Sequence, residues 1–255
     1  MKITILTLFP EMFDSFLNTS IIKRAISKEV IEFNIVNIRD FTLDKYGRVD
    51  SAPVGGGAGL IMKCQPVIDA LKAQEKGKTI LFSPRGKTFD QKKAHELAKE
   101  EHIILLCGHY EGLDERISHY IDEEISIGDY ILTGGEIASL AVSDAIVRLL
   151  DGAITHESIE EESFENGLLE YPQYTEPYEY DGITIPDILY SGNHEAIAKW
   201  RKKESLRITK DRRPDLFKLY PLTKQDLKLL KEIEEGTIGK WETNALEKGK
   251  KFIKK

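Results

Sequence analysis

Cysteine is scarce in this chain, which has only Cys64 and Cys107 among its 255 residues. Small secreted domains that depend on disulfide bonds are much richer in cysteine, so nothing in the composition suggests a disulfide framework. Cys107 lies within an apolar run, and we expect its side chain to be buried. This cysteine usage is typical of a cytoplasmic protein.

Long apolar runs are also missing, and none approaches the roughly 20 residues that a helix needs to cross a bilayer. The N-terminal sequence MKITILTLFP contains an apolar stretch that resembles part of a signal peptide. The stretch is short, contains threonine and lacks a small-residue cleavage site, so it indicates a first β-strand instead. We expect no membrane partner.

The histidines, cysteines and glycines of this chain do not have the spacing that zinc sites and nucleotide-binding motifs require. The six histidines are scattered, and no pair stands at zinc-site spacing with a cysteine. Gly55 and Gly57 would need a third glycine at position 60 for a dinucleotide fingerprint, but that residue is Leu60. Two Gly-Lys-Thr triplets resemble the end of a P-loop, yet Lys72 and Leu81 stand where each requires its first glycine. No residue is therefore assigned to a structural metal.

Charge is unevenly distributed along the chain, whose net charge is −7. The segment from Lys199 to Lys255 contains 18 Lys and Arg but only 9 Asp and Glu, a net charge of +9, and the rest carries −16. An acidic body with a basic end suggests that the end binds a polyanion. A solvated helical surface with a lysine-rich tail is the alternative.

Strand patterns alternate with helix patterns in the first 150 or so residues. We expect strands at Lys2–Leu8, Phe33–Ile38, Thr79–Phe82, Ile103–Cys107 and Ile125–Ile127, and helices from Phe9-Pro10-Glu11 to about Lys28, at Gln91–Glu100 and at Glu136–Leu150. This alternation predicts a parallel sheet with right-handed crossovers. The pattern is lost from Asp151 to about Pro186, and helices are expected again at Glu195–Ile208 and Thr223–Glu234.

A glycine-punctuated stretch from Leu105 to Glu136 carries the most specific signal. Two short apolar runs end at Gly108 and Gly128, and a third loop is Thr133-Gly134-Gly135. Glycine lets the backbone approach a ligand closely, and ligands of open α/β sheets bind at strand ends. The loops therefore predict one pocket built largely from backbone groups. Ordinary connecting loops are the alternative, because glycine is common in loops.

Two motifs in this stretch carry a resemblance to a known family. Gly-His-Tyr-Glu-Gly-Leu-Asp-Glu-Arg from Gly108, and Ser-Ile-Gly-Asp-Tyr-Ile-Leu-Thr-Gly-Gly-Glu from Ser126, closely resemble the cofactor loops of bacterial tRNA (guanine-N1)-methyltransferases. These enzymes methylate the guanine at position 37 of tRNA, just 3′ of the anticodon, and belong to the SPOUT class of knotted methyltransferases. The resemblance runs from Leu8 to Pro214.

The resemblance implies an α/β fold with a SPOUT-type parallel sheet and a trefoil knot, plus a small helical C-terminal domain. Residues 1–155 would bind S-adenosylmethionine, 156–186 would be a flexible linker and domain entry, and 187–255 would bind the anticodon arm of tRNA. A cytoplasmic homodimer with its active site between subunits is implied. tRNA, and not DNA, is the expected nucleic acid, which gives the basic segment a partner.

Cofactor-binding residues follow from the same motifs. The resemblance implies Ser83, Pro84, Gly108, Tyr110, Glu111, Gly112, Ile127, Gly128, Asp129, Tyr130, Ile131, Leu132, Gly134 and Gly135. Backbone groups of these loops would hold the adenine edge, and Glu111 would accept hydrogen bonds from ribose hydroxyls. Core packing is the alternative role for Tyr110 and Tyr130.

The chemistry requires a base and a cation. N1 of guanine carries a proton at neutral pH, so a base must remove it, and the resulting negative charge spreads to O6, where a cation should lie. The resemblance implies Arg148 as the cation and Glu162, which precedes Ser163-Phe164, as the base. The family has aspartate there, and this segment is one residue shorter, so Glu161 competes for the role. A solvated acidic linker is the alternative.

The remaining site assignments concern the substrate. The run from Gly55 to Gly59 resembles the family's glycine-rich loop. Asp50, beside this loop, is expected at the substrate and is the next candidate for the base, while Arg212 and Arg213 are expected to contact tRNA. Family members also use magnesium, and the cluster Glu160-Glu161-Glu162 is a candidate site for it. Glu176 stands where the family usually has arginine before proline, which exchanges a cation for an anion near the substrate path. Ala138 stands where proline is common, with little effect expected.

Two rival functions remain at this point. A catalytically idle RNA-binding module would keep the basic segment but need not keep intact cofactor loops. A SPOUT methyltransferase that acts on a different RNA atom would keep both.

Overall fold

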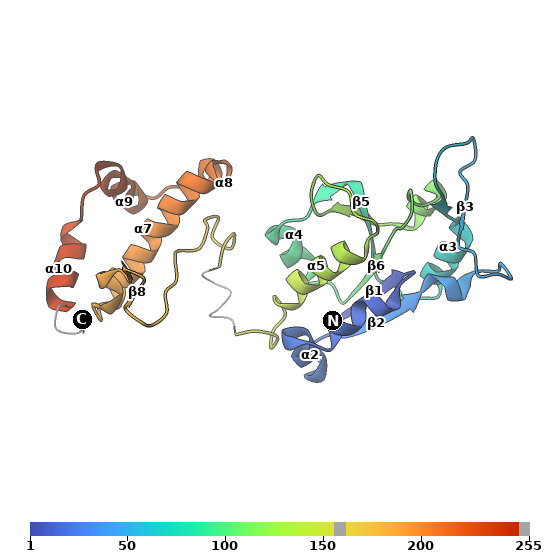
Figure 1. Ribbon diagram of the computed structural model, residues 1–255, viewed down its shortest axis with the longest axis horizontal. Helices are drawn as coiled ribbons and strands as arrows, with labels where there is room; N and C mark the ends of the chain where they lie inside the picture. The colour runs from blue at the N-terminus through green and yellow to red at the C-terminus, as the bar shows by residue number, and fades with distance from the viewer. Residues whose placement is uncertain (156–161, 250–255) are drawn as a thin grey trace. The chain divides into compact units, whose positions relative to one another are not determined.

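The chain folds into two compact units, Met1–His156 and Glu157–Lys255, both drawn in Figure 1. The structure is a computed structural model and describes residues 1–155 and 162–249. The first unit is an α/β domain, and the second consists mainly of helices. Within these two ranges, no helix is both long enough and apolar enough to cross a membrane.

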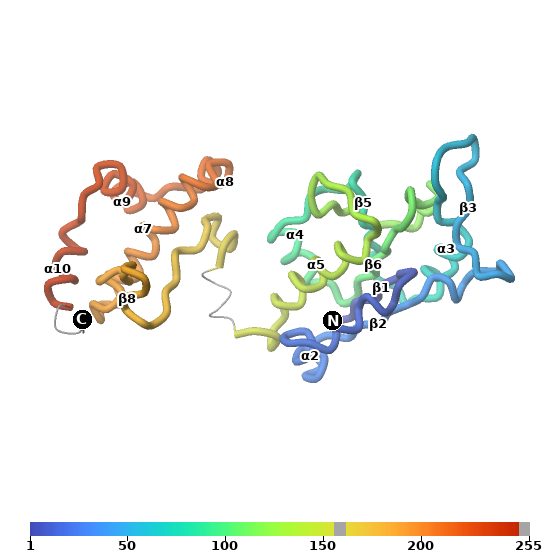
Figure 2. The backbone as a smooth tube through the Cα atoms, in the orientation of Figure 1, coloured from blue at the N-terminus to red at the C-terminus, as the bar shows by residue number. Residues whose placement is uncertain are grey.

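Five strands form the main sheet of the first unit in the order β2-β1-β6-β5-β7, and every neighbouring pair is parallel. The strands are β1 (Lys2–Thr7), β2 (Glu32–Asn37), β5 (Lys78–Thr88), β6 (His102–Leu106) and β7 (Glu123–Ser126). Figure 2 shows β1 beside β6, although the two are far apart in the sequence. The arrangement confirms the predicted α/β class with a parallel sheet.

Alternate residues of the central strands are buried on opposite faces of this sheet. Ile103 and Leu105 pack in one apolar cluster, while Ile104 and Leu106 pack in the other. The first cluster includes residues of α2 (Ser20–Ser27), α4 (Gln91–Leu97) and α5 (Glu136–Val147), and the second includes residues of α3 (Cys64–Lys72). Because both faces are covered, the strands read as continuous apolar runs.

The single helix predicted from Pro10 to Lys28 is wrong. The segment forms η1 (Pro10–Phe13), α1 (Asp14–Leu17) and α2, and Thr19 between the last two has an extended backbone. The Asn18 amide donates to Asp14 O at 2.8 Å, and the Thr19 hydroxyl donates to Ser15 O at 2.5 Å. The Thr19 hydroxyl occupies the Ser15 carbonyl, which the backbone N–H of Thr19 would use in a continuing helix, and this competition favours the end of α1.

Other elements differ from the expectation in length or existence. The predicted helices Gln91–Glu100 and Glu136–Leu150 end earlier, at Leu97 and Val147. The helices α3, α8 (Pro214–Leu219) and α10 (Lys240–Gly249) were not predicted. Nor were the short strands β3 (Asp50–Ser51) and β4 (Ile61–Met62) or the 3-10 helices η2 (Ile38–Phe41) and η3 (Glu115–Tyr120).

The second unit is built on α7 (His194–Arg212) and α9 (Lys224–Glu235), with the hairpin β8 (Glu179–Tyr180) and β9 (Ile183–Thr184) and η4 (Asp187–Tyr190) before them. The helix α7 runs to Arg212, beyond the predicted end at Ile208, and α8 begins at Pro214. Thr223 and Asp226 form a capping box at the start of α9, where a helix was predicted to begin. Leu168 packs against Leu206 and Leu229 in one of two small apolar clusters. Part of the segment that precedes the helices therefore belongs to their core.

Candidate active site

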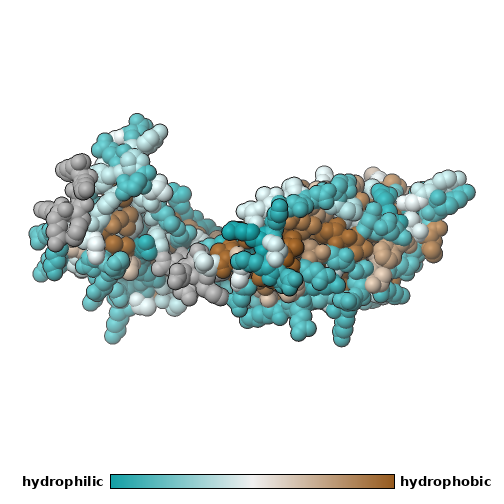
Figure 3. Space-filling model, turned by 90° about the horizontal axis from the view of Figure 1, so that it is seen from below, coloured by the Kyte–Doolittle hydropathy of each residue, from teal (hydrophilic) through white to brown (hydrophobic). Residues whose placement is uncertain are grey.

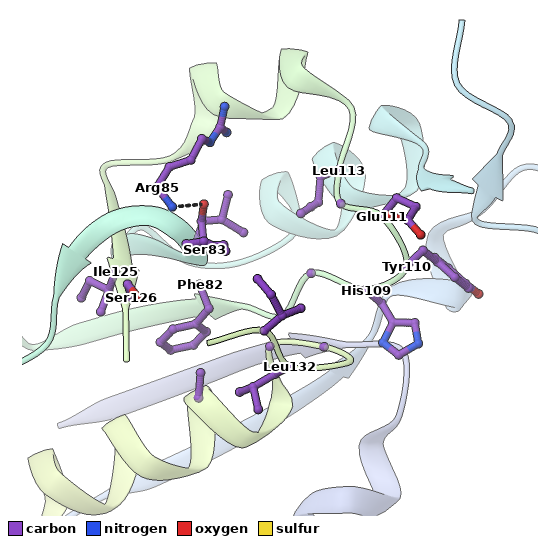
Figure 4. Close-up of a pocket in the computed structure, with 18 of the residues that line it drawn as sticks. Phe82, Ser83, Arg85, His109, Tyr110, Glu111, Leu113, Ile125, Ser126 and Leu132 are labelled. Atoms are coloured by element: carbon purple, nitrogen blue, oxygen red, sulfur yellow. Dashed lines mark hydrogen bonds between the residues drawn. The ribbon is translucent and has the colours of Figure 1, made fainter. Parts of the chain in front are cut away.

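A pocket of about 650 Å³ lies at the carboxyl ends of β5, β6 and β7 in the first unit. Its lining comes from three segments, Leu81–Arg85, Gly108–Ser118 and Ile125–Ala138, though not from every residue in them. Figure 4 shows Phe82 and Ser83 on one side, Tyr110 and Glu111 on the other, and Leu132 between them. Because β5, β6 and β7 are parallel, their carboxyl ends lie at the same edge of the sheet, and the three loops that follow them share one cavity.

Thirteen of the fourteen predicted cofactor residues line this pocket. They are Ser83, Pro84, Gly108, Tyr110, Glu111, Gly112, Ile127, Gly128, Tyr130, Ile131, Leu132, Gly134 and Gly135. Asp129 is exposed and does not belong to the lining. It lies at the tip of a tight turn in which Tyr130 N donates to Gly128 O at 3.0 Å, and the turn leaves its side chain outside the pocket.

Sequence reasoning missed several lining residues, among them Arg85, His109, Leu113, Asp114, Glu115 and Ser118. Arg85 follows Ser83-Pro84 directly, and Asp114 and Glu115 belong to the Gly-His-Tyr-Glu-Gly-Leu-Asp-Glu-Arg motif. Extending each predicted loop by its polar neighbours would have found them. Ala138 also lines the pocket and is buried, at the position where the family often has proline.

Two of the pocket loops are fastened to each other through close backbone contact. Gly135 N donates to Gly108 O at 2.8 Å, and His109 and Gly134 form an isolated antiparallel bridge. A Cβ on Gly135 would lie only 2.7 Å from Cys107 Cα, so no larger residue fits there without a backbone shift. Glycine at this position serves the close approach of two chain segments.

The loop that carries Glu111 is joined to the strand that follows the glycine-rich loop. Glu111 N donates to Leu60 O at 3.0 Å, and Met62 N donates to Gly112 O at 2.9 Å. A Cβ on Gly59 would collide with the side chain of Glu111. Asp50 lies on β3, which pairs with β4, so the expected substrate residue and the pocket loop share one hydrogen-bonded framework.

The charges around the pocket are mostly paired. The pKa of the Asp114 carboxyl is lowered by its hydrogen bonds from Arg116, at 2.7 and 2.8 Å. The pKa of Arg85 is raised by its hydrogen bond to Glu115 and by the charge of Glu124. Asp114 is therefore a carboxylate, and Arg85 a cation, throughout the physiological range.

Beneath the pocket, a second group of polar residues is buried. Burial, followed by the nearby Glu136 carboxylate, raises the pKa of Cys107 well above its usual value, so this thiol stays neutral. Glu136 accepts a hydrogen bond from the Thr7 hydroxyl at 2.8 Å. That bond ties the start of α5 to the end of β1, directly under the Gly134-Gly135 loop.

The two expected catalytic residues belong to different units. Arg148 is half-buried and caps the C-terminus of α5 in the first unit. Glu162 is half-buried at the start of the described part of the second unit, where its carbonyl accepts from Glu165 N at 3.4 Å. Glu160 and Glu161 lie outside the described residues. Among the residues that are described, no group of three or more His, Cys, Asp or Glu side chains is arranged to hold a metal ion.

The expected tRNA contacts lie at the end of α7. Arg212 is exposed, and the Arg213 guanidinium donates to Asp215 at 2.6 Å. This hydrogen bond lowers the pKa of Asp215 to about 2. Glu176, which replaces the family's usual arginine, accepts a hydrogen bond from the Tyr190 hydroxyl at 3.0 Å, so this anion is held by its own unit.

A known protein family and several known proteins match this chain over most of its length. The family described as tRNA (Guanine-1)-methyltransferase TrmD matches residues 1–219. A Clostridium botulinum (strain Hall) tRNA (guanine-N(1)-)-methyltransferase is 58% identical over 239 residues, which are 92% of this chain and 99% of that protein. The Clostridium perfringens (strain SM101) protein of the same name is 56% identical over 235 residues, or 91% and 99% of the two chains.

Proposed function

Because the chain belongs to the tRNA (guanine-1)-methyltransferase family, we propose that it methylates N1 of the guanine at position 37 of tRNA with S-adenosylmethionine. The match over residues 1–219, with 58% identity to a curated relative of nearly the same length, carries this conclusion. The chain is a methyltransferase, and its substrate is tRNA. A tRNA substrate favours a cytoplasmic location.

The pocket of the first unit suits S-adenosylmethionine. Its volume of about 650 Å³ is within the range of small-molecule sites. Two glycines of the lining allow a close approach of the loops. A Cβ on Gly134 would collide with the His109 ring, and a Cβ on Gly135 would collide with the backbone of Cys107. S-adenosylmethionine supplies a methyl group on a sulfonium. We assign its binding to the thirteen lining residues predicted from the loops, with Glu111 toward the ribose hydroxyls.

The direct test is incubation with labelled S-adenosylmethionine and bulk tRNA, followed by nucleoside analysis. The label is expected in 1-methylguanosine at position 37. Label in another nucleoside would point to a different RNA-methylating activity of the SPOUT class. Binding of tRNA without any transfer would point to an RNA-binding module.

We assign the proton transfer to Glu162 and the stabilisation of the charge on O6 to Arg148. A carboxylate that takes the N1 proton frees the lone pair that accepts the methyl group. A guanidinium near O6 stabilises the negative charge that develops there only during methyl transfer. Asp50 is assigned to the guanine substrate, and the Glu160-Glu161-Glu162 cluster remains a candidate for magnesium.

A trefoil knot and a homodimer are also part of the proposal. The tight seating of Gly134-Gly135 against Cys107-Gly108 is the kind of contact that a threaded loop requires. Figure 3 shows apolar side chains on one face of the first unit. Exposed apolar residues of this unit include Tyr130 (56%), Ile131 (81%) and Ile137 (49%), which lie on the pocket loop and α5. A second subunit would cover them.

Arg212 and Arg213 are proposed to bind tRNA phosphates. Replacing both by alanine should weaken tRNA binding and lower the slope of log affinity against log salt by up to about 2, because each phosphate contact contributes roughly 0.7 to 0.9. Filter binding between low and moderate salt measures this slope. Replacing the exposed Lys92 and Lys99 of the first unit removes the same charge and should leave the slope unchanged. An equal change in both double variants would refute the assignment.

A further inference from the structure

The pocket contains one cation and several anions. Of the described residues that line it, Arg85 is the only lysine or arginine, while the carboxylates are those of Glu111, Asp114 and Glu115. S-adenosylmethionine has the opposite balance, since its sulfonium and ammonium are cations and its methionine carboxylate is the single anion. One guanidinium in the pocket thus matches one carboxylate on the ligand.

The backbone places Arg85 at the pocket wall. Phe82 and Lys87 both pair with Ile125 of β7, so the residues between them bulge out of the register of β5. Arg85 N donates to Ser83 Oγ at 3.1 Å inside this bulge, as Figure 4 shows. A Cβ on Gly86 would collide with the backbone of β7, so the bulge lies close against its neighbour. The Arg85 backbone is fixed on both sides.

The side chain of Arg85 is held loosely enough to accept a ligand. Its Nη1 lies 3.1 Å from Glu115 Oε2, and both side chains are mostly exposed, at 61% and 72%. Ion pairs between exposed side chains contribute little to stability, so a ligand can displace Glu115 at small cost. Nη2 lies 3.4 Å from Oε1 of Glu124, which is only 26% exposed, and the buried Oε2 of Glu124 has no hydrogen-bond partner in the structure. Glu124 thus contacts a different nitrogen of the guanidinium from the one that Glu115 contacts.

We propose that Arg85 binds the methionine carboxylate of S-adenosylmethionine, and that Glu115 gives up its place on the guanidinium to the ligand. This inference rests on the proposed function. The planar fork of arginine donates two parallel hydrogen bonds to a carboxylate, which no other side chain lining the pocket offers. Arg85 is thus a binding residue that selects the amino-acid end of the cofactor.

Calorimetry with S-adenosylmethionine and its decarboxylated form tests the proposal. The two ligands share the sulfonium and the ammonium and differ in the carboxylate alone. The wild-type protein should bind S-adenosylmethionine about tenfold more tightly than the decarboxylated form, as expected for a charge-assisted pair that stays partly exposed. The Arg85→Gln variant should lose this preference. Its affinity for S-adenosylmethionine should fall, while its affinity for the decarboxylated form should be at least that of the wild-type protein.

Lys87→Gln is the matched control, because Lys87 is an exposed cation on the same strand that does not line the pocket. This variant should retain the tenfold preference. An Arg85→Gln variant that weakens both ligands equally, or neither, would overturn the carboxylate assignment while leaving the methyltransferase proposal intact. A wild-type protein that binds neither ligand would instead refute the proposed cofactor pocket itself.

Discussion

Calorimetry of the Gly134→Val variant should show an affinity for S-adenosylmethionine about 10- to 100-fold below that of the wild-type protein. A Cβ at Gly134 would meet the Glu136 carboxylate and would lie 2.7 Å from His109 Nδ1. Overpacking of this kind costs about 1–3 kcal/mol, and every 1.4 kcal/mol is a factor of about ten in affinity. The strain falls on the two loops that face the ligand, so binding is the property that suffers.

Gly135→Val should have the larger effect of the two. The nearest atoms to its Cβ would be Cys107 Cα at 2.7 Å and Gly108 N at 3.1 Å, which are backbone atoms at the end of a central strand. A side chain can rotate away from a new neighbour, whereas this strand end cannot move without disturbing the sheet. We therefore expect loss of cofactor binding together with a lower melting temperature.

Thr88→Val provides the control for both variants. Thr88 is exposed at the end of β5, does not line the pocket and already carries a β-branched side chain, so valine adds no new volume there. The affinity of this variant for S-adenosylmethionine should stay within a few-fold of the wild-type value. A Gly134→Val protein that melts normally and binds the cofactor as tightly as the Thr88→Val protein would remove the Gly134 loop from the site.

Most of the pocket could be predicted because its residues depend on local signals. A buried strand that ends in glycine is visible in the sequence, as at Cys107-Gly108 and Ile127-Gly128. Parallel strands bring such ends to the same edge of a sheet, so the loops converge without any long-range information. The strand order itself, with β6 beside β1, depends on pairings between distant segments and could not be deduced locally.

The misses have equally physical causes. Arg85 lies in a bulge of β5, which forms because Phe82 and Lys87 both pair with Ile125. This pairing involves the distant strand β7, so the sequence around Arg85 gave no sign of it. The helix α10 has only a few apolar contacts, among them Trp241 and Ala245, in a highly charged segment, so its helical period is weak in the sequence. The hydrogen bond from the Thr19 hydroxyl to Ser15 O, together with the extended backbone of Thr19, divides a segment whose apolar spacing predicted one helix.

Glu162→Gln should reduce methyl transfer by a factor on the order of 10²–10⁴, as is typical when a general base is removed. Glutamine keeps the shape of the side chain but cannot accept the N1 proton of guanine. Glu162 begins a turn in the second unit, followed by Ser163, whose Oγ accepts from Glu170 N at 2.9 Å. Single-turnover methylation with saturating tRNA and cofactor isolates the chemical step from binding.

Arg148→Ala should cost a comparable factor in the same assay. Its guanidinium is proposed to stabilise the negative charge on O6, which exists mainly in the transition state. Turnover should therefore fall much more than cofactor affinity. Arg148 caps α5, and its backbone N donates to Asp144 O at 3.2 Å, a bond that alanine preserves. Equal losses in cofactor binding and turnover would indicate a structural role for the side chain.

Glu161 is the main competitor for the role of base, one residue from Glu162. Glu161→Gln alone should retain most of the activity, and the Glu161→Gln/Glu162→Gln double variant should be at least as slow as Glu162→Gln. Glu165→Gln is the matched control, because it removes a nearby carboxylate of the same unit and should leave the rate unchanged. If the double variant transfers the methyl group at the wild-type rate, the base lies elsewhere. Asp50, on β3 beside the glycine-rich loop, then becomes the residue to replace.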